Sequence, residues 1–93
     1  MNIKFRWSQT GRHSNLVKHG LDFADAERVL EGRAFTFEDD RFDYGARRFV
    51  TLGLLAGIPV SLVHTETAHE IRIISFRQAT ASETRLYVEQ AGE

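Results

Sequence analysis

Apolar and polar positions alternate with a period of two in several parts of the chain, which predicts short β-strands with one buried face. At the start of the chain, Ile3, Phe5 and Trp7 alternate with Lys4 and Arg6. Later runs are rich in β-branched and aromatic residues, and short loops between them predict antiparallel hairpins. The predicted strands cover residues 3–7, 34–37, 48–55, 60–65 and 71–77, with hairpin loops at 56–59 and 66–70.

Helical periodicity and end signals predict two helices between the first and second strands. The first covers residues 10–19 and stops at Gly20, because glycine readily adopts the left-handed conformation that ends a helix. The second is capped by Asp22, and its apolar residues recur at helical spacing until Gly32 ends it.

A last helix follows the final strand. Thr80 and Glu83 have the spacing of a capping box, and Leu86 and Val88 supply apolar positions beyond it. The predicted order is therefore one strand, two helices, four strands and a helix. Helices grouped apart from a mainly antiparallel sheet of four or five strands define an α+β fold.

The composition fits one small globular domain over residues 1–93, with 42% hydrophobic and 27% charged residues. The absence of cysteine excludes disulfides and thiolate metal sites and favours a reducing compartment, so we expect the protein in the cytoplasm. The longest apolar stretch, 49–63, is interrupted by Gly, Ser, Thr and Pro, and it lacks the roughly 20 apolar residues of a membrane span. Residues 1–10 carry no secretory signal pattern.

Charge is unevenly distributed, although the net charge is only -1. Residues 1–21 carry four basic residues and no acid, whereas residues 22–43 carry eight acids and three arginines. Ten of the twelve basic residues are arginine, which favours planar contacts with phosphate or carboxylate. The pattern predicts one cationic and one anionic face, or simply a solvated surface.

Three side chains on the last two strands are candidates for chemistry. His64 lies at the edge of an apolar row, where it is either a proton-transfer group or a half-buried, hydrogen-bonded histidine. Arg72 and Arg77 lie beside apolar residues, so each either pairs with an acid or faces a groove as a phosphate clamp. A histidine beside such a clamp is the minimum equipment for RNA cleavage without a metal, because the 2′-hydroxyl is an internal nucleophile. The register of the strands decides whether these side chains share a face.

The four histidines do not have the spacing of a metal site, and no cofactor is expected. Lys18 and His19 end the first predicted helix, where cations also gain from the helix dipole.

Taken together, a set of residues over about 5–89 resembles the BrnT family of toxins. The most specific parts of the resemblance are Lys-His-Gly after the tryptophan and the later Arg-Ile-Ile-Ser-x-Arg-x-Ala run. The matching positions are Trp7, Asn15, Lys18-His19-Gly20, Phe23, Tyr44-Gly45, Arg48, Gly53, Gly57, His64-Thr65, Arg72-Ile73-Ile74-Ser75, Arg77, Ala79, Glu83 and Tyr87.

The resemblance implies a RelE/ParE-like α+β fold and a ribonuclease that inhibits translation. It also implies a BrnA-like antitoxin with a ribbon-helix-helix segment, so that the hetero-oligomer reaches operator DNA only through the antitoxin. On the matching positions, Arg72 and Arg77 are expected to bind the phosphate, His64 to transfer a proton, and Glu83 to orient an arginine or act as a base. Lys18, His19 and Arg48 are expected to hold the RNA backbone.

The sequence departs from the family pattern at three positions. Where the family usually has Asp and Lys, this chain has Ser8 and Gly11, and Ala46 replaces a Glu. Arg12, next to Gly11, is a candidate replacement for the lysine in RNA binding. The departures keep two alternatives open: a catalytically weak partner and co-repressor of the antitoxin, or a ParE-like topoisomerase inhibitor.

Overall fold

The computed structural model describes residues 3–40, 45 and 47–92; Tyr44 and Ala46 lie outside the described residues. The α+β fold predicted from the sequence is confirmed. In chain order the elements are β1 (Lys4–Arg6), α1 (Gln9–His19), the short 3₁₀ helix η1 (Phe23–Asp25), α2 (Ala26–Glu31), β2 (Phe35–Asp39), β3 (Arg48–Leu55), β4 (Ile58–Glu66), β5 (Glu70–Gln78) and α3 (Ala81–Gln90).

The strands form one five-stranded sheet in the order β1-β5-β4-β3-β2. Strands β2 to β5 make the predicted antiparallel meander, but β1 pairs in parallel with β5, with Arg6 opposite Arg72. The sheet is therefore mixed but mainly antiparallel, as predicted, and the parallel pairing of β1 is the feature that the sequence did not predict. No hairpin joins β1 to β5, so the tight-turn constraint that fixes neighbouring strands as antiparallel does not act on this pair.

The turn between β3 and β4 is shorter than predicted. Ala56 and Gly57 both have positive φ, at 51° and 81°, as in a two-residue hairpin turn. Strand β4 consequently begins at Ile58, and Pro59 lies opposite Leu54 within the ladder.

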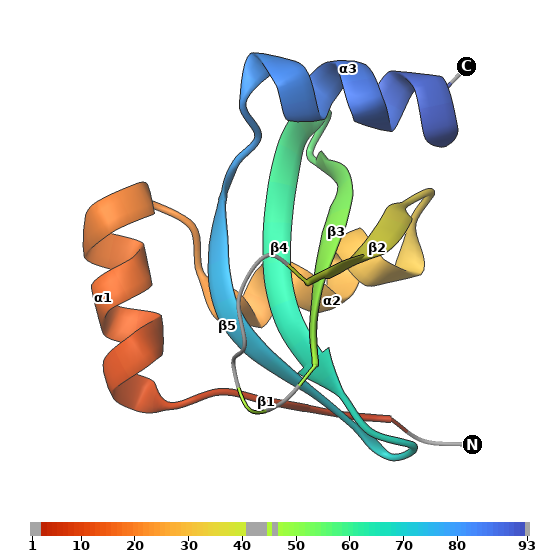
Figure 1. Cartoon of the computed structure of the whole chain (residues 1–93). Coiled ribbons are helices and arrows are strands. Elements are labelled where there is room, and N and C mark those ends of the chain that lie inside the picture. The colour runs from red at the N-terminus through yellow and green to blue at the C-terminus, as the bar shows by residue number, and fades with distance from the viewer. Residues whose placement is uncertain (1–2, 41–44, 46, 93) are drawn as a thin grey trace.

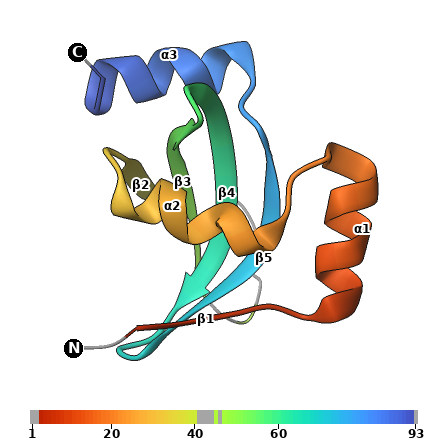
Figure 2. The ribbon, with the colours of Figure 1, turned by 180° about the vertical axis from the view of Figure 1, so that it is seen from behind.

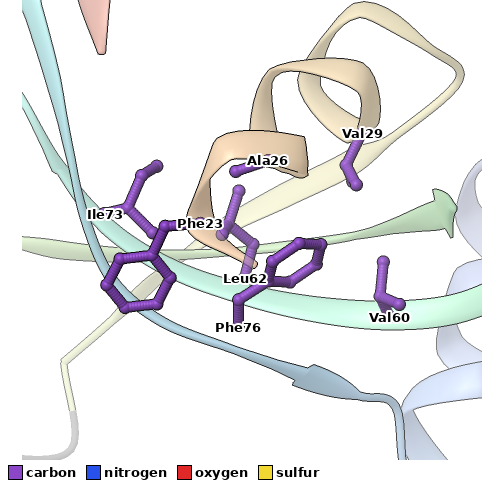
Figure 3. Close-up of a cluster of buried hydrophobic side chains, with 7 residues drawn as sticks. All are labelled: Phe23, Ala26, Val29, Val60, Leu62, Ile73 and Phe76. Carbon is purple, nitrogen blue, oxygen red and sulfur yellow. The ribbon is translucent and has the colours of Figure 1, made fainter. Parts of the chain in front are cut away.

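One side of the sheet, here called the α2 face, is covered by η1 and α2 (Figure 2). Phe23, Ala26 and Val29 from these helices pack against β4 and β5, as Figure 3 shows. Alternate strand residues complete the cluster because they point to the same side of the sheet. These strand residues are Val60, Leu62, Ile73 and Phe76.

The opposite side, here called the α3 face, is only partly covered. Helix α3 lies across one end of the sheet (Figure 1), where Tyr87 packs with Val50 and Leu52. The Tyr87 hydroxyl donates a 2.9 Å hydrogen bond to the Arg33 carbonyl, which ties α3 to the chain after α2. None of the described helices lies over the strands at the other end of this face (Figure 1).

Helix α1 lies beside β5 and contacts it through Asn15, which is 7% exposed. The Asn15 amide donates to the Phe76 carbonyl at 2.7 Å and accepts from the Phe76 amide at 3.0 Å. Strand β1 pairs only with the first part of β5. Farther along β5, the Asn15 side chain forms the hydrogen bonds with the Phe76 backbone that a neighbouring strand would otherwise form. None of the helices in the described part of the chain combines the length and apolarity that crossing a bilayer requires.

Candidate functional site

A β-bulge in β5 decides which side chains share a face. Arg72 lies opposite Thr65 and Arg77 opposite Ser61, so five steps along β5 correspond to four along β4. Ile74 is the extra residue, because it has no partner on β4 between the pairs formed by Ser75 and Ile73. Arg72 and Arg77 therefore both lie on the α3 face, although an odd spacing would separate them on a regular strand.

Arg77 is held by an acid from α3. Its two terminal nitrogens lie 2.8 and 2.9 Å from the two carboxylate oxygens of Glu83. Glu83 also accepts from the Thr80 amide at 2.9 Å and donates its own amide to Thr80, which confirms the predicted capping box. The bond from Arg77 lowers the pKa of Glu83, so this carboxylate is ionised at neutral pH. The helix cap thus positions the arginine.

Beside this pair, the α3 face contains a concave region of about 370 Å³, here called the hollow. It lies between the end of β2, the middle of the sheet and the start of α3. Its lining residues are Phe37, Glu38, Asp39, Asp40, Val50, Ser61, Val63, Arg77 and Glu83.

Basic side chains continue along the α3 face beyond the hollow. Arg72 is exposed, and Arg6 lies opposite it on β1, where it pairs with Glu70 at 2.7 Å. Arg48, also on this face, lies opposite Asp39 in the β2–β3 ladder. The acids Glu27 and Glu31 are exposed on α2 behind the sheet. The α3 face thus carries arginines together with the acids that pair with them, and α2 on the other face carries Arg28 between its two glutamates.

His64 does not join the arginines. It follows Leu62 on the α2 face, and its side chain is 0% exposed. Its Nε2 lies 2.8 Å from the Thr51 hydroxyl, which in turn lies 2.7 Å from the Thr36 hydroxyl. The expectation that His64 transfers a proton beside Arg72 is therefore corrected: Thr65, the neighbour of His64, is the residue that shares a face with Arg72.

Burial also changes the protonation of His64, since desolvation lowers its pKa from 6.5 to about 4. The ring is neutral at physiological pH. Its Nδ1 lies 3.4 Å from a Glu66 oxygen without forming a hydrogen bond. His64 serves as a neutral core residue that links β3 to β4.

This burial makes stability depend on pH. Between pH 6.5 and about 4 the unfolded chain binds a proton that folded His64 does not, so the free energy of unfolding falls as the pH is lowered. We expect a loss of about 3 kcal/mol across this window. Urea unfolding at a series of pH values measures it, and His64→Gln, which does not titrate, provides the control. If the free energy of unfolding fell equally with pH in both proteins above pH 4.5, the loss would not come from His64.

The residues expected on α1 lie apart from Arg77. The Arg12 guanidinium makes two hydrogen bonds to Asp22, at 2.7 and 2.9 Å. Hydrogen bonding to Arg12 is the largest cause that lowers the pKa of Asp22 to about 2. Arg12 therefore joins α1 to η1. Lys18 and His19 are exposed at the end of α1, and His19 borders a separate depression near the β3–β4 turn.

Ser8 and Gly11, two of the positions where the sequence departs from the BrnT pattern, contact each other. Ser8 is the N-cap of α1, and its hydroxyl accepts from the Gly11 amide at 2.9 Å. A Cβ at Gly11 would lie 2.8 Å from that hydroxyl. These two residues form a local helix start, and any longer residue at position 11 requires the Ser8 side chain to move.

Two residues of the sheet were not identified from the sequence. Ser61 lies between Val60 and Leu62 and lines the hollow, and Thr51 is the hydrogen-bond partner of His64. The only available signal was a hydroxyl residue inside an apolar strand. In the part of the chain that the structure describes, no cluster of His, Asp and Glu is arranged to hold a metal ion.

Comparison with known proteins places this protein in the class of toxins of type II toxin–antitoxin systems. The family model described as "Ribonuclease toxin, BrnT, of type II toxin-antitoxin system" matches residues 7–83. The chain belongs to the BrnT family of ribonuclease toxins. Membership implies a cognate antitoxin as partner.

A solved structure supports this result. The crystal structure of the Brucella abortus ribonuclease toxin BrnT matches with a TM-score of 0.69 and 29% sequence identity, covering 85% of this chain and 99% of that one. No curated protein matches the chain.

Proposed function

We propose that this chain is a metal-independent endoribonuclease that cleaves RNA, inhibits translation and growth, and acts in the cytoplasm. The observation that carries the proposal is the bulge at Ile74, which brings Arg72 and Arg77 to one accessible face beside a hollow. Family membership supplies the reaction class.

In the proposed reaction, the 2′-hydroxyl of RNA loses its proton to water as it attacks the adjacent phosphorus. The bond to the 5′-oxygen breaks, and this oxygen takes up a proton from water, so that the products end in a 2′,3′-cyclic phosphate and a 5′-hydroxyl. Negative charge grows on the phosphate oxygens in the transition state, and guanidinium groups held in place stabilise such charge without reorganising. Arg77, fixed by Glu83, is the main stabilising group, and Arg72 binds the neighbouring backbone. Glu83 acts as a positioning residue because Arg77 and the Thr80 amide already occupy its oxygens.

Arg48 lies on the same face, opposite Asp39, and extends the proposed RNA path across the sheet. Arg12, Lys18 and His19 belong to α1, so we assign them to the outer backbone of a longer RNA or to the scaffold. We further propose that a BrnA-like antitoxin neutralises the toxin and that its ribbon-helix-helix segment makes all contacts with operator DNA.

The test is RNA cleavage by the purified protein in the presence of EDTA. We expect fragments that end in 2′,3′-cyclic phosphate and, on induction in a bacterial host, RNA decay with arrested growth. Cleavage that requires added divalent metal would contradict metal independence. Harmless induction would favour the inactive partner, and DNA damage with intact RNA would favour the topoisomerase inhibitor.

A further inference from the structure

Three polar side chains form a row across β1, β5 and β4, at the end of the sheet that lies away from α3 (Figure 1). Arg6 on β1 lies opposite Arg72 on β5, and Arg72 lies opposite Thr65 on β4. Residues directly opposite each other on neighbouring strands point to the same side of the sheet, and the strands are about 4.8 Å apart. Arg6, Arg72 and Thr65 therefore lie side by side on the α3 face, and we call them the transverse row.

Arg72, in the middle of the transverse row, is an exposed cation. Its side chain makes no hydrogen bond or ion pair with any residue that the structure describes. A second arginine lies on one side of it and a hydroxyl on the other. The Arg72 guanidinium is therefore available to an anion from outside the protein.

The charge around Arg72 favours such an anion. On the described strands β1, β4 and β5, Glu70 is the acid that lies on this face, and it pairs with Arg6 at 2.7 Å. Glu66 lies on the α2 face, and Lys4 adds a further cation opposite Glu70. Like charges that lie directly opposite each other destabilise a sheet, so the facing of Arg6 and Arg72 carries a cost. An anion bound between the two arginines would remove that repulsion.

Thr65 supplies a hydroxyl at the end of the transverse row. The residue is half-buried, and its hydroxyl makes no hydrogen bond with the described residues. The register that pairs Phe49 with His64 brings Arg48 alongside Thr65, so another arginine follows on β3. Arginine and hydroxyl side chains are common donors to the phosphate oxygens of nucleic acids. The row has no apolar side chain of the kind that fills the centre of a protein–protein interface, so its chemistry favours a phosphate over an acidic protein segment.

We propose, resting on the proposed ribonuclease function, that the transverse row binds a backbone phosphate of the RNA substrate. Arg6 and Arg72 converge on this phosphate, and Thr65 donates a hydrogen bond to it from the surface of the sheet. The row anchors the RNA backbone beside the scissile phosphate, which lies at Arg77. Arg6 and Thr65 are thereby RNA-binding residues.

Binding of a single-stranded 2′-O-methyl RNA oligonucleotide tests this inference. The oligonucleotide keeps the phosphates but lacks the nucleophilic hydroxyl, so it is not cleaved. Fluorescence anisotropy at a series of salt concentrations measures the affinity and its salt dependence. We expect Arg6→Ala to weaken binding about tenfold, since it removes a charged donor, and Thr65→Val to weaken it about threefold, since it removes a neutral one.

A double variant tests whether the two arginines share one phosphate. Arg6→Ala combined with Arg72→Ala should lose less affinity than the product of the two single losses, because groups that bind the same atom do not act independently. The slope of log affinity against log salt should become shallower by about 0.7, the contribution of one phosphate on a single strand. A change twice as large would show that the arginines bind separate phosphates and would overturn the shared site.

Arg28→Ala is the matched control, because it removes an exposed arginine from α2 on the opposite face of the sheet. It should leave the affinity unchanged. Circular dichroism confirms that the variants fold, and the exposed pair of Arg6 with Glu70 contributes little to stability. Unchanged affinity in Arg6→Ala, or an equal loss in Arg28→Ala, would overturn the proposal. Unchanged RNA binding with weaker neutralisation by the antitoxin would assign the row to an acidic segment of that protein instead.

RNA cleavage tests the proposed function separately. Oligonucleotide binding that depends on Arg6, without cleavage of unmodified RNA, would overturn the proposed ribonuclease activity and leave the phosphate site in place. Cleavage by a protein whose affinity for the oligonucleotide does not depend on Arg6 would do the reverse.

Discussion

Arg77→Ala should lower the rate of RNA cleavage by a factor of about 100 to 1,000, the usual effect of removing one preorganised group that stabilises transition-state charge. The guanidinium is fixed by two bonds to Glu83 and faces the hollow. Its loss should hardly change the fold, because the pair is partly exposed, with the side chains 34% and 21% accessible. Such pairs contribute about 1 kcal/mol or less to stability.

Single-turnover cleavage of a defined RNA, with circular dichroism to confirm folding, measures this effect. Arg85→Ala, which removes an exposed arginine from the same helix that carries Glu83, is the matched control. Glu83→Gln keeps a residue able to complete the helix cap but removes the charge that holds Arg77, so it should reduce the rate while retaining the melting temperature. Full activity in folded Arg77→Ala would rule out this site.

Asn15→Leu should destabilise the protein by about 4 kcal/mol, a large part of the 5–15 kcal/mol typical of a domain. The Asn15 side chain satisfies the amide and carbonyl of Phe76 and the carbonyl of Leu21. Leucine fills a similar volume but leaves these backbone groups without partners. Each unpaired buried group costs about 1–3 kcal/mol.

Urea unfolding at neutral pH measures the change, and Ser14→Ala reports the cost of an ordinary exposed substitution on the same helix. Hydrogen exchange at Phe76 gives a second readout, since its amide should exchange faster in Asn15→Leu even where the global fold persists. A loss below about 1 kcal/mol would show that the edge of β5 does not depend on this contact.

Local signals in the sequence predicted the boundaries of the helices well. Gly20 ends α1 with a φ of 73°, and the Asp22 side chain accepts from the Ala24 amide at the start of η1. The capping box of α3 was also predicted correctly. These features depend on residues within a few positions of each other, so a single sequence contains the information that fixes them.

The placement of the candidate site could be predicted only in part. The sequence identified Arg72, Arg77 and Glu83, and the structure brings Arg77 and Glu83 together on the α3 face. It places His64 in the core and reveals Ser61 in the hollow. Both outcomes depend on which face a strand residue takes, and a shift of one residue reverses that face.

By itself, the sequence determined the order of helices and strands, the meander from β2 to β5 and the resemblance to BrnT toxins. Only the tertiary structure decided the parallel pairing of β1 with β5 and the bulge at Ile74. The alternation of apolar and polar residues along one strand can be seen in the sequence itself. The insertion of one unpaired residue depends on how two strands align, and here that alignment puts Arg72 on the open face and His64 in the core.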